Sequence, residues 1–142
     1  MQIITQDHTF ESVIYNKEEI NTIWHKVKDE IKRTDCEFLD HKDIKKLLLC
    51  GDYILWVVKY KNTDNIVGVG ILEIVFYIKH TISRVVSIGG NQIDKWLNTH
   101  KTAFEDWSKH IGCTHVDFCG RKGWKKILSD YEEDSIIFRK KL

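Results

Sequence analysis

The 142-residue sequence predicts a single α/β domain (residues 1–142), with a mixed sheet of about six strands and helices on both faces. Its length is that of one domain. Segments rich in β-branched and aromatic residues alternate with segments whose apolar residues recur at helical spacing. Over residues 82–119, a strand, a glycine break and a long amphipathic helix lead into another strand. That unit predicts a parallel pair joined by a right-handed crossover.

The first third of the chain predicts one strand followed by two helices. Residues 8–15 have the composition of a strand. Asn16 and Glu19 then have the spacing of a capping box, and apolar residues at helical spacing follow them. Asp40 is expected to cap a second, shorter helix, which Gly51 ends.

The remainder of the chain predicts a hairpin, a third strand and two further helix–strand units. Gly89 and Gly90 are expected to form the turn before the long helix, which Asn91 caps. The other expected elements are strands over residues 53–60, 66–78, 82–88, 114–119 and 135–140, and a short helix over residues 124–131. The resulting order is β-α-α-β-β-β-α-β-α-β. Gly68 and Gly70, inside one strand, indicate a distorted backbone or a close approach by another group.

Composition excludes several classes of function. The formal net charge is +1, which disfavours nucleic acid and anionic membranes as partners. The first ten residues lack the features of a secretory signal, and no apolar run reaches the length of a membrane helix. The four cysteines form no C-x-x-C pair and are expected to be reduced thiols in a cytoplasmic protein.

Two local features sharpen the reading of the fold. One is the strand, glycine turn and long helix of residues 85–110, and the other is the sequence CGRKGW at residues 119–124. With the order of elements, they resemble the GNAT superfamily of N-acetyltransferases. The second feature, together with Gly89-Gly90 and Trp96-Leu97, resembles small GNAT-like proteins encoded by tailed phages. The resemblance implies acetyl-CoA as the cofactor and no metal.

In GNAT enzymes, the loop between the fourth strand and the third helix presents backbone N–H groups to the pyrophosphate of CoA. The candidate cofactor-binding residues at that place are Ser87, Ile88, Gly89, Gly90 and Asn91. The family signature is Gln or Arg, two residues, Gly, one residue, then Gly or Ala. Its nearest match here begins at residue 84 and has serine where the first glycine belongs. The alternative is a plain strand-to-helix turn.

Two residues are candidates for the acid–base chemistry of acyl transfer. Glu73 lies in an otherwise apolar strand, where a carboxylate could act as the general base. Alternatively, it points to solvent or pairs with a lysine. Tyr131 is a candidate general acid, because the resemblance implies a tyrosine on the last helix. Alternatively, it is a packing residue.

A basic turn at the start of the last helix contains Arg121 and Lys122, followed closely by Trp124. These residues could bind a phosphate or another acidic group, or Arg121 could simply close a surface ion pair. The nearby histidines and cysteines have none of the paired spacings of a zinc site.

Two functions are compatible with these residues. The first is an acyl-CoA-dependent N-acyltransferase that acts on an unidentified amine. The second is a catalytically inactive GNAT-like phage protein, which would serve as a virion component or bind a host protein. The expected partners are accordingly an amine acceptor, a protein partner or virion proteins, in the host cytoplasm or the virion.

Overall fold

The computed structural model describes residues 1–120 and 122–142, and its sheet has six strands in the order β1-β2-β3-β4-β5-β6. The strands are β1 (Gln2–Gln6), β2 (Phe10–Tyr15), β3 (Ile54–Tyr60), β4 (Ile66–Phe76), β5 (Thr81–Gly90) and β6 (His115–Phe118). Neighbouring strands are antiparallel, except that β5 and β6 are parallel. Only the step from β5 to β6 therefore needs a crossover.

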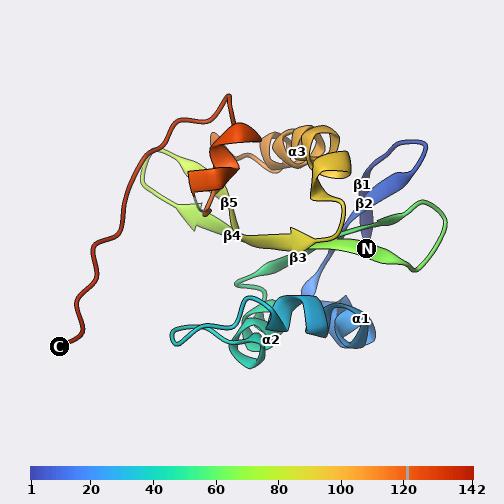
Figure 1. Cartoon of the computed structure of the whole chain (residues 1–142), viewed down its shortest axis with the longest axis horizontal. Helices are drawn as coiled ribbons and strands as arrows, with labels where there is room; N and C mark the ends of the chain where they lie inside the picture. The colour runs from blue at the N-terminus through green and yellow to red at the C-terminus, as the bar shows by residue number, and fades with distance from the viewer. Residues whose placement is uncertain (121) are drawn as a thin grey trace.

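Helices cover both faces of this sheet. Helices α1 (Ile20–Lys32) and α2 (His41–Cys50) lie on one face, and α3 (Ile93–His110) lies on the other and makes the crossover (Figure 1). Short 3₁₀ turns precede α1 (η1, Lys17–Glu19) and follow β6 (η2, Lys122–Lys126). The predicted mixed sheet with helices on both faces is confirmed.

Each face of the sheet packs its own core. The α1/α2 side buries Val13, Ile20, Val27, Leu48, Leu55, Val57 and Ile71, among others. The α3 side is richer in aromatic residues and buries Phe10, Trp56, Leu72, Val85, Trp96, Leu97 and Phe104. Along β3, alternate residues enter opposite cores, as the period of a strand requires.

The helix ends follow the sequence closely. The Glu19 carboxylate accepts the N–H of Asn16 at 3.2 Å, as a capping box requires. The Asp40 carboxylate accepts the N–H of Asp43 at 2.9 Å and caps α2. Gly51 ends α2 with φ 87°, a left-handed conformation that favours glycine.

The close approach expected at the two strand glycines is also confirmed. A Cβ on Gly68 would lie 2.4 Å from the indole ring of Trp96, and one on Gly70 would lie 3.0 Å from Trp56. The two indole rings meet edge to face, with centroids 6.5 Å apart. Gly68 therefore lets Trp96, in the first turn of α3, pack directly onto the backbone of β4, and Gly70 makes room for Trp56 of β3.

A buried chain of hydrogen bonds ties α3 to β2. The Trp56 indole N–H donates to the hydroxyl of Ser12 at 3.1 Å, and that hydroxyl shares a hydrogen bond of 2.5 Å with His100 Nδ1. The other ring nitrogen of His100, Nε2, lies 3.1 Å from the Asp7 carboxylate. His100 and Ser12 are fully buried, so each polar atom of the pair needs these partners.

The two ends of the chain differ from the sequence prediction. β1 was not expected, and the first predicted strand begins at Phe10 instead of residue 8. The expected strand over residues 135–140 does not form, and only a 3₁₀ turn replaces the predicted helix of residues 124–131. Residues 135–140 are exposed and have no neighbouring strand in the described sheet, and propensity alone does not make a strand.

The expected turn and cap before α3 are also wrong. Gly89 and Gly90 are the last residues of β5, and Gln92, with φ 58°, is the N-cap of α3 in place of Asn91. Gly90 has φ 140°, and a Cβ there would lie 2.1 Å from the carbonyl oxygen of Val67. Close pairing with β4 thus extends the strand through both glycines.

In the described part of the chain, no helix combines the length and apolar character that crossing a bilayer requires.

Replacing Gly68 by alanine should destabilise the fold by about 2 kcal/mol, because the new methyl group would overlap the Trp96 ring. Urea unfolding followed by tryptophan fluorescence measures the change. Gly123→Ala is the matched control, since nothing lies within 4 Å of a Cβ there. Equal effects of the two substitutions would contradict the proposed packing.

The Asp7 carboxylate should make folding pH-dependent at low pH. Partial burial raises its pKa. Hydrogen bonds from the backbone N–H groups of Phe10 and Thr9 and from the side chain of His100 lower the pKa by more, so that it lies below the usual value of 3.8. The stabilisation that this carboxylate provides is therefore fully present at pH values above its pKa in the unfolded chain. It is lost as the pH falls through its pKa in the folded protein.

Asp7→Asn should remove about 1 kcal/mol at pH 6 and less at pH 3. Thermal unfolding at both pH values checks this, with the exposed Asp29→Asn as control. A destabilisation by Asp7→Asn that is the same at both pH values would count against the mechanism.

Candidate functional site

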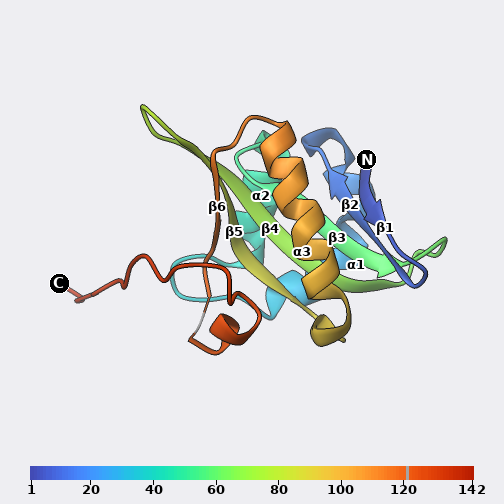
Figure 2. The ribbon, with the colours of Figure 1, turned by 90° about the horizontal axis from the view of Figure 1, so that it is seen from above.

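One extra residue in β5 separates it from β6. The register of β4 and β5 pairs Ile71 with Ser87 but Leu72 with Val85, so Val86 is the additional residue of a β-bulge. Pairing of β5 with β6 ends at the same level, with Val85 opposite Phe118. Beyond it the two strands diverge (Figure 2), and we call this place the splay.

The bulge decides which backbone groups face the splay. The Cys119 N–H donates to the Val85 carbonyl at 2.9 Å, whereas the Asn91 N–H donates to Val67 on β4 at 2.7 Å. Backbone groups of successive strand residues face opposite neighbours. Counting back from Asn91, the N–H groups of Ile88 and Gly90 face away from β4, toward the splay.

The loop that follows is short, and an acidic residue lies just after it in the first turn of α3. Asn91 and Gln92 alone separate β5 from α3. The Asn91 N–H is bound to β4, and the Lys95 N–H donates to the Gln92 carbonyl at 2.8 Å. Asp94 lies in the first turn of α3, where a carboxylate competes with any bound anion for the positive end of the helix.

The five predicted cofactor-binding residues therefore divide into two sets. Ser87, Ile88, Gly89 and Gly90 lie in the strand that borders the splay, where an extended, amide-bearing chain such as pantetheine could pair with the backbone. Asn91 begins the loop where a pyrophosphate would lie, and Asp94 makes that end a poor fit for it. The residues present fit the pantetheine arm better than the pyrophosphate.

Glu73 belongs to a row of charges across three strands. It pairs in register with Arg84, which pairs with Asp117 on β6. The Arg84 guanidinium lies 3.4 Å from Glu73 Oε1 and 3.0 Å from Asp117 Oδ2. This row lies on the α1/α2 side of the sheet, two residues before Val86 along β5, and has a net charge of −1.

Two more side chains belong to the same side of the sheet. Tyr53, just before β3, packs against the α1/α2 core, and Cys119 follows β6 at the spacing of Asp117. Burial raises the pKa of the Tyr53 hydroxyl, and the charge of Glu73 raises it further. Burial likewise raises the pKa of the Cys119 thiol, which is thereby kept protonated.

Tyr131 lies on the other side of the sheet. Its hydroxyl donates to Glu105 on α3 at 2.6 Å, and its ring packs edge-on against Phe118. Burial raises the pKa of this hydroxyl, and the Glu105 carboxylate raises it further. The structure therefore does not bring Glu73 and Tyr131 together, and the contacts of Tyr131 are those of a packing residue.

The predicted basic turn is only partly described. Arg121 lies outside the described residues. Lys122 and Trp124 form part of η2, on the α3 side of the sheet past the end of β6 (Figure 1). A Cβ on Gly120 would lie 2.8 Å from the Trp124 ring, which packs against the aromatic core. Trp124 thus packs at the margin of that core.

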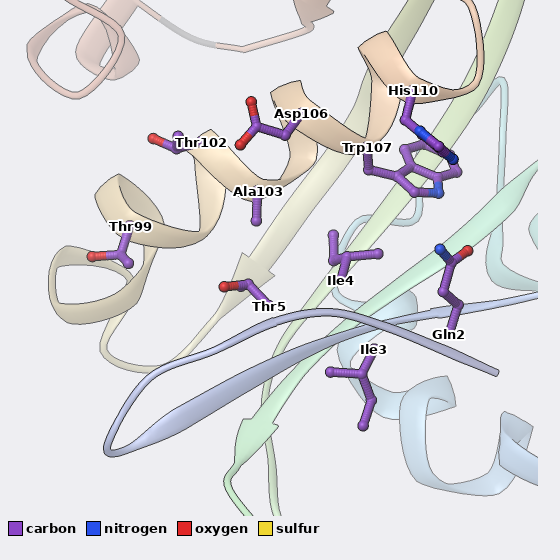
Figure 3. A pocket seen from close by; sticks show the side chains of 10 residues that line it. All are labelled: Gln2, Ile3, Ile4, Thr5, Thr99, Thr102, Ala103, Asp106, Trp107 and His110. Atoms are coloured by element: carbon purple, nitrogen blue, oxygen red, sulfur yellow. The ribbon is translucent and has the colours of Figure 1, made fainter.

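A separate groove of 470 Å³ runs between β1 and α3 (Figure 3). Thr99, Thr102 and Asp106 line its helical wall, and Trp107 forms part of its floor. None of the residues predicted from the sequence lines it. Since β1 is at the opposite edge of the sheet from β6, the groove is distinct from the splay.

Among the described residues, no group of three His, Cys, Asp or Glu side chains is placed to hold a metal ion.

Solved structures show which fold this is. A probable acetyltransferase matches with a TM-score of 0.68 and 10% identity, over 92% of this chain and 95% of its own. An aminoglycoside acetyltransferase from an uncultured soil metagenomic sample matches with a TM-score of 0.64 and 14% identity, over 94% and 96%. A GNAT family acetyltransferase from Staphylococcus aureus matches with a TM-score of 0.60 and 16% identity, over 94% and 99%.

The chain has the fold of GNAT acetyltransferases. No protein-family model and no curated protein matches its sequence. At 10–16% identity the likeness concerns the fold, so the chemistry must be argued from the site itself.

The sequence did not point to several parts of this GNAT-fold site. Arg84 and Asp117 lie 33 positions apart and meet only because β5 and β6 are parallel neighbours. Tyr53 could not be recognised as a site residue from the sequence, because an aromatic residue at the start of a strand is common. The alternation of polar and apolar residues along 115–118 was the available hint that Asp117 faces away from Val116 and Phe118.

Proposed function

We propose that the protein is an acyl-CoA-dependent N-acyltransferase that acts on an amine. The observation that carries this proposal is the bulge at Val86, which ends the pairing of β5 with β6 and turns backbone N–H groups toward the splay. Preorganised N–H groups stabilise the negative charge that develops in acyl transfer. Acetyl-CoA, when bound, supplies the activated acetyl group.

In this proposal Glu73 is the general base. It is about one-third exposed, and its Oε1 lies 3.4 Å from the Arg84 guanidinium, which fixes its position. The net charge of −1 on the row attracts a protonated amine. Glu73 then accepts a proton from the ammonium group, directly or through water, and frees the nitrogen lone pair for attack.

The alternative is a catalytically inactive GNAT-like protein, encoded by a phage and acting as a virion component or by binding a host protein. The two-residue loop and Asp94 favour it, since both weaken the site for a pyrophosphate. A complete lack of acetyl-CoA binding would leave this alternative.

Deleting Val86 should abolish acetyl-CoA binding, because β4 and β5 would then pair without a bulge and the splay would close. Isothermal titration with acetyl-CoA measures the affinity, and circular dichroism checks the fold. Val86→Ala is the matched control, since it keeps the bulge and shortens only the side chain. Wild-type binding that survives the deletion would place the cofactor elsewhere.

Glu73→Gln should lower kcat/KM for an amine acceptor about 100-fold, as expected for the loss of a general base, and should flatten the acidic limb of the pH profile. Release of the CoA thiol, followed across a panel of primary amines, measures the rate. Asp117→Asn removes the other carboxylate from Arg84 but keeps Glu73, so it should weaken only the attraction of the amine, raise KM a few-fold and leave kcat nearly unchanged. Equal losses in both variants would mean that the ion row is only structural.

A further inference from the structure

The proposed reaction needs a proton donor as well as the base Glu73. When the amine nitrogen bonds to the acetyl carbon, the CoA sulfur leaves as a thiolate, which a nearby acid must protonate. Tyr131 was expected to be that acid, but its hydroxyl donates to Glu105 on the α3 side of the sheet. Glu73 lies on the α1/α2 side, together with Arg84 and Asp117. A donor that works with Glu73 is therefore expected on the α1/α2 side.

Tyr53 is the cross-strand neighbour of Glu73. In the pairing of β3 with β4, Leu55 lies opposite Ile71. Two residues further toward the start of β3, the same register places Tyr53 opposite Glu73. Leu55 and Ile71 belong to the core on the α1/α2 side, and alternate residues of a strand share a face. Tyr53 and Glu73 therefore stand side by side on that face, with Cβ atoms about 5 Å apart.

The charges that act on the Tyr53 hydroxyl come from both sides of β5. Burial raises its pKa most, and the charges of Glu73 on β4 and of Cys119 after β6 raise it further. Within the described part of the chain, no hydrogen bond contributes to that shift. The Cys119 N–H donates to the Val85 carbonyl at 2.9 Å, at the point where the splay begins. The hydroxyl is thus protonated and within reach of the start of the splay.

Cys119 is the other group at the start of the splay with a proton to give. Its thiol is exposed, and β5 separates it from Glu73. Tyr53 is instead half-buried and adjacent to the base, so a proton that Glu73 has taken up can pass to it. An acid that regains its proton in this way is ready for the next turnover. Tyr53 therefore fits the role better than Cys119.

We propose that Tyr53 is the general acid of the acyl transfer and works as a pair with Glu73, its neighbour on β4. This role rests on the proposed acyltransferase activity, because without acetyl-CoA there is no thiolate to protonate. It puts the acid and the base on adjacent strands, on the face of the sheet where the ion row attracts the amine.

The protons balance over one turnover. Glu73 first passes one proton of the ammonium group to water. As the nitrogen–carbon bond forms, Glu73 takes a second proton from the nitrogen. Tyr53 donates its hydroxyl proton to the sulfur, which keeps the electron pair of the broken carbon–sulfur bond. Glu73 then returns its proton to the phenolate, so the products are an amide and the CoA thiol, and both residues regain their starting charges.

Tyr53→Phe should lower kcat about 100-fold, as expected for the loss of a general acid, and should leave the Kd for acetyl-CoA unchanged. The ring stays in place, so the fold should be retained, and thermal unfolding checks this. Release of the CoA thiol at saturating acetyl-CoA and amine measures kcat, and isothermal titration measures the Kd. Tyr131→Phe is the matched control, because it removes the hydroxyl bound to Glu105 and should keep most of the activity.

A second acyl donor separates proton donation from packing. The thiolate of S-phenyl thioacetate leaves without being protonated, so the ratio of the wild-type rate to the Tyr53→Phe rate should fall close to unity with this donor. A ratio as large as that measured with acetyl-CoA would mean that Tyr53 acts only through packing, and it would overturn the proposal.

The variants also distinguish Tyr53 from the other candidate acids. Full kcat in Tyr53→Phe, with a large loss in Tyr131→Phe or in Cys119→Ala, would assign the role to that other residue and overturn the proposal. If the wild type is active and Glu73→Gln shows its expected loss, an active Tyr53→Phe removes the role of Tyr53 alone. If the wild type acylates no amine, the proposed function itself fails, and the role of Tyr53 fails with it.

Discussion

A strand in the interior of a sheet has two edges, and each backbone N–H can serve only one of them. In β5, the insertion of Val86 opposite the step from Ile71 to Leu72 changes which neighbour each later residue faces. Before the bulge, β5 pairs with both β4 and β6. After it, pairing with β4 continues to Gly90, whereas pairing with β6 stops. The splay, and with it the proposed chemistry, depends on this single extra residue.

The remainder of the fold holds that distortion in place. Gly90 and Asn91 lie directly against Val67, so β5 remains bound to β4 beyond the bulge. The Trp96 ring lies against Gly68 on the next strand, which fixes the start of α3 over the same place. Further along α3, the buried hydrogen bonds of His100 bind it to β2. A strand that is bent at one point is thereby supported on its intact side by close packing.

The positions of charged residues explain why the site was only partly predictable. Glu73 stood out because a carboxylate is rare in an apolar strand, but its partner could not be identified from spacing. Arg84 was first considered as part of a phosphate-binding signature, and the structure shows it bound to two carboxylates. Tyr131 fitted the position of a family residue, yet its hydroxyl is bound to Glu105 on the other side of the sheet. Hydrogen-bond partners of this kind depend on which strands are neighbours.

The sequence by itself determined the α/β class, helices α1 and α2 with their caps, the presence of α3, the central strands and the close approach at Gly68 and Gly70. These features follow from local periodicity, from capping residues and from the need of glycine where another group comes close. The tertiary structure decided where β5 ends, where the bulge falls and which residues form the ion row. It also decided that residues 135–140 form no strand, although their composition is that of one. Register and pairing are contacts between distant segments, so local propensity cannot fix them.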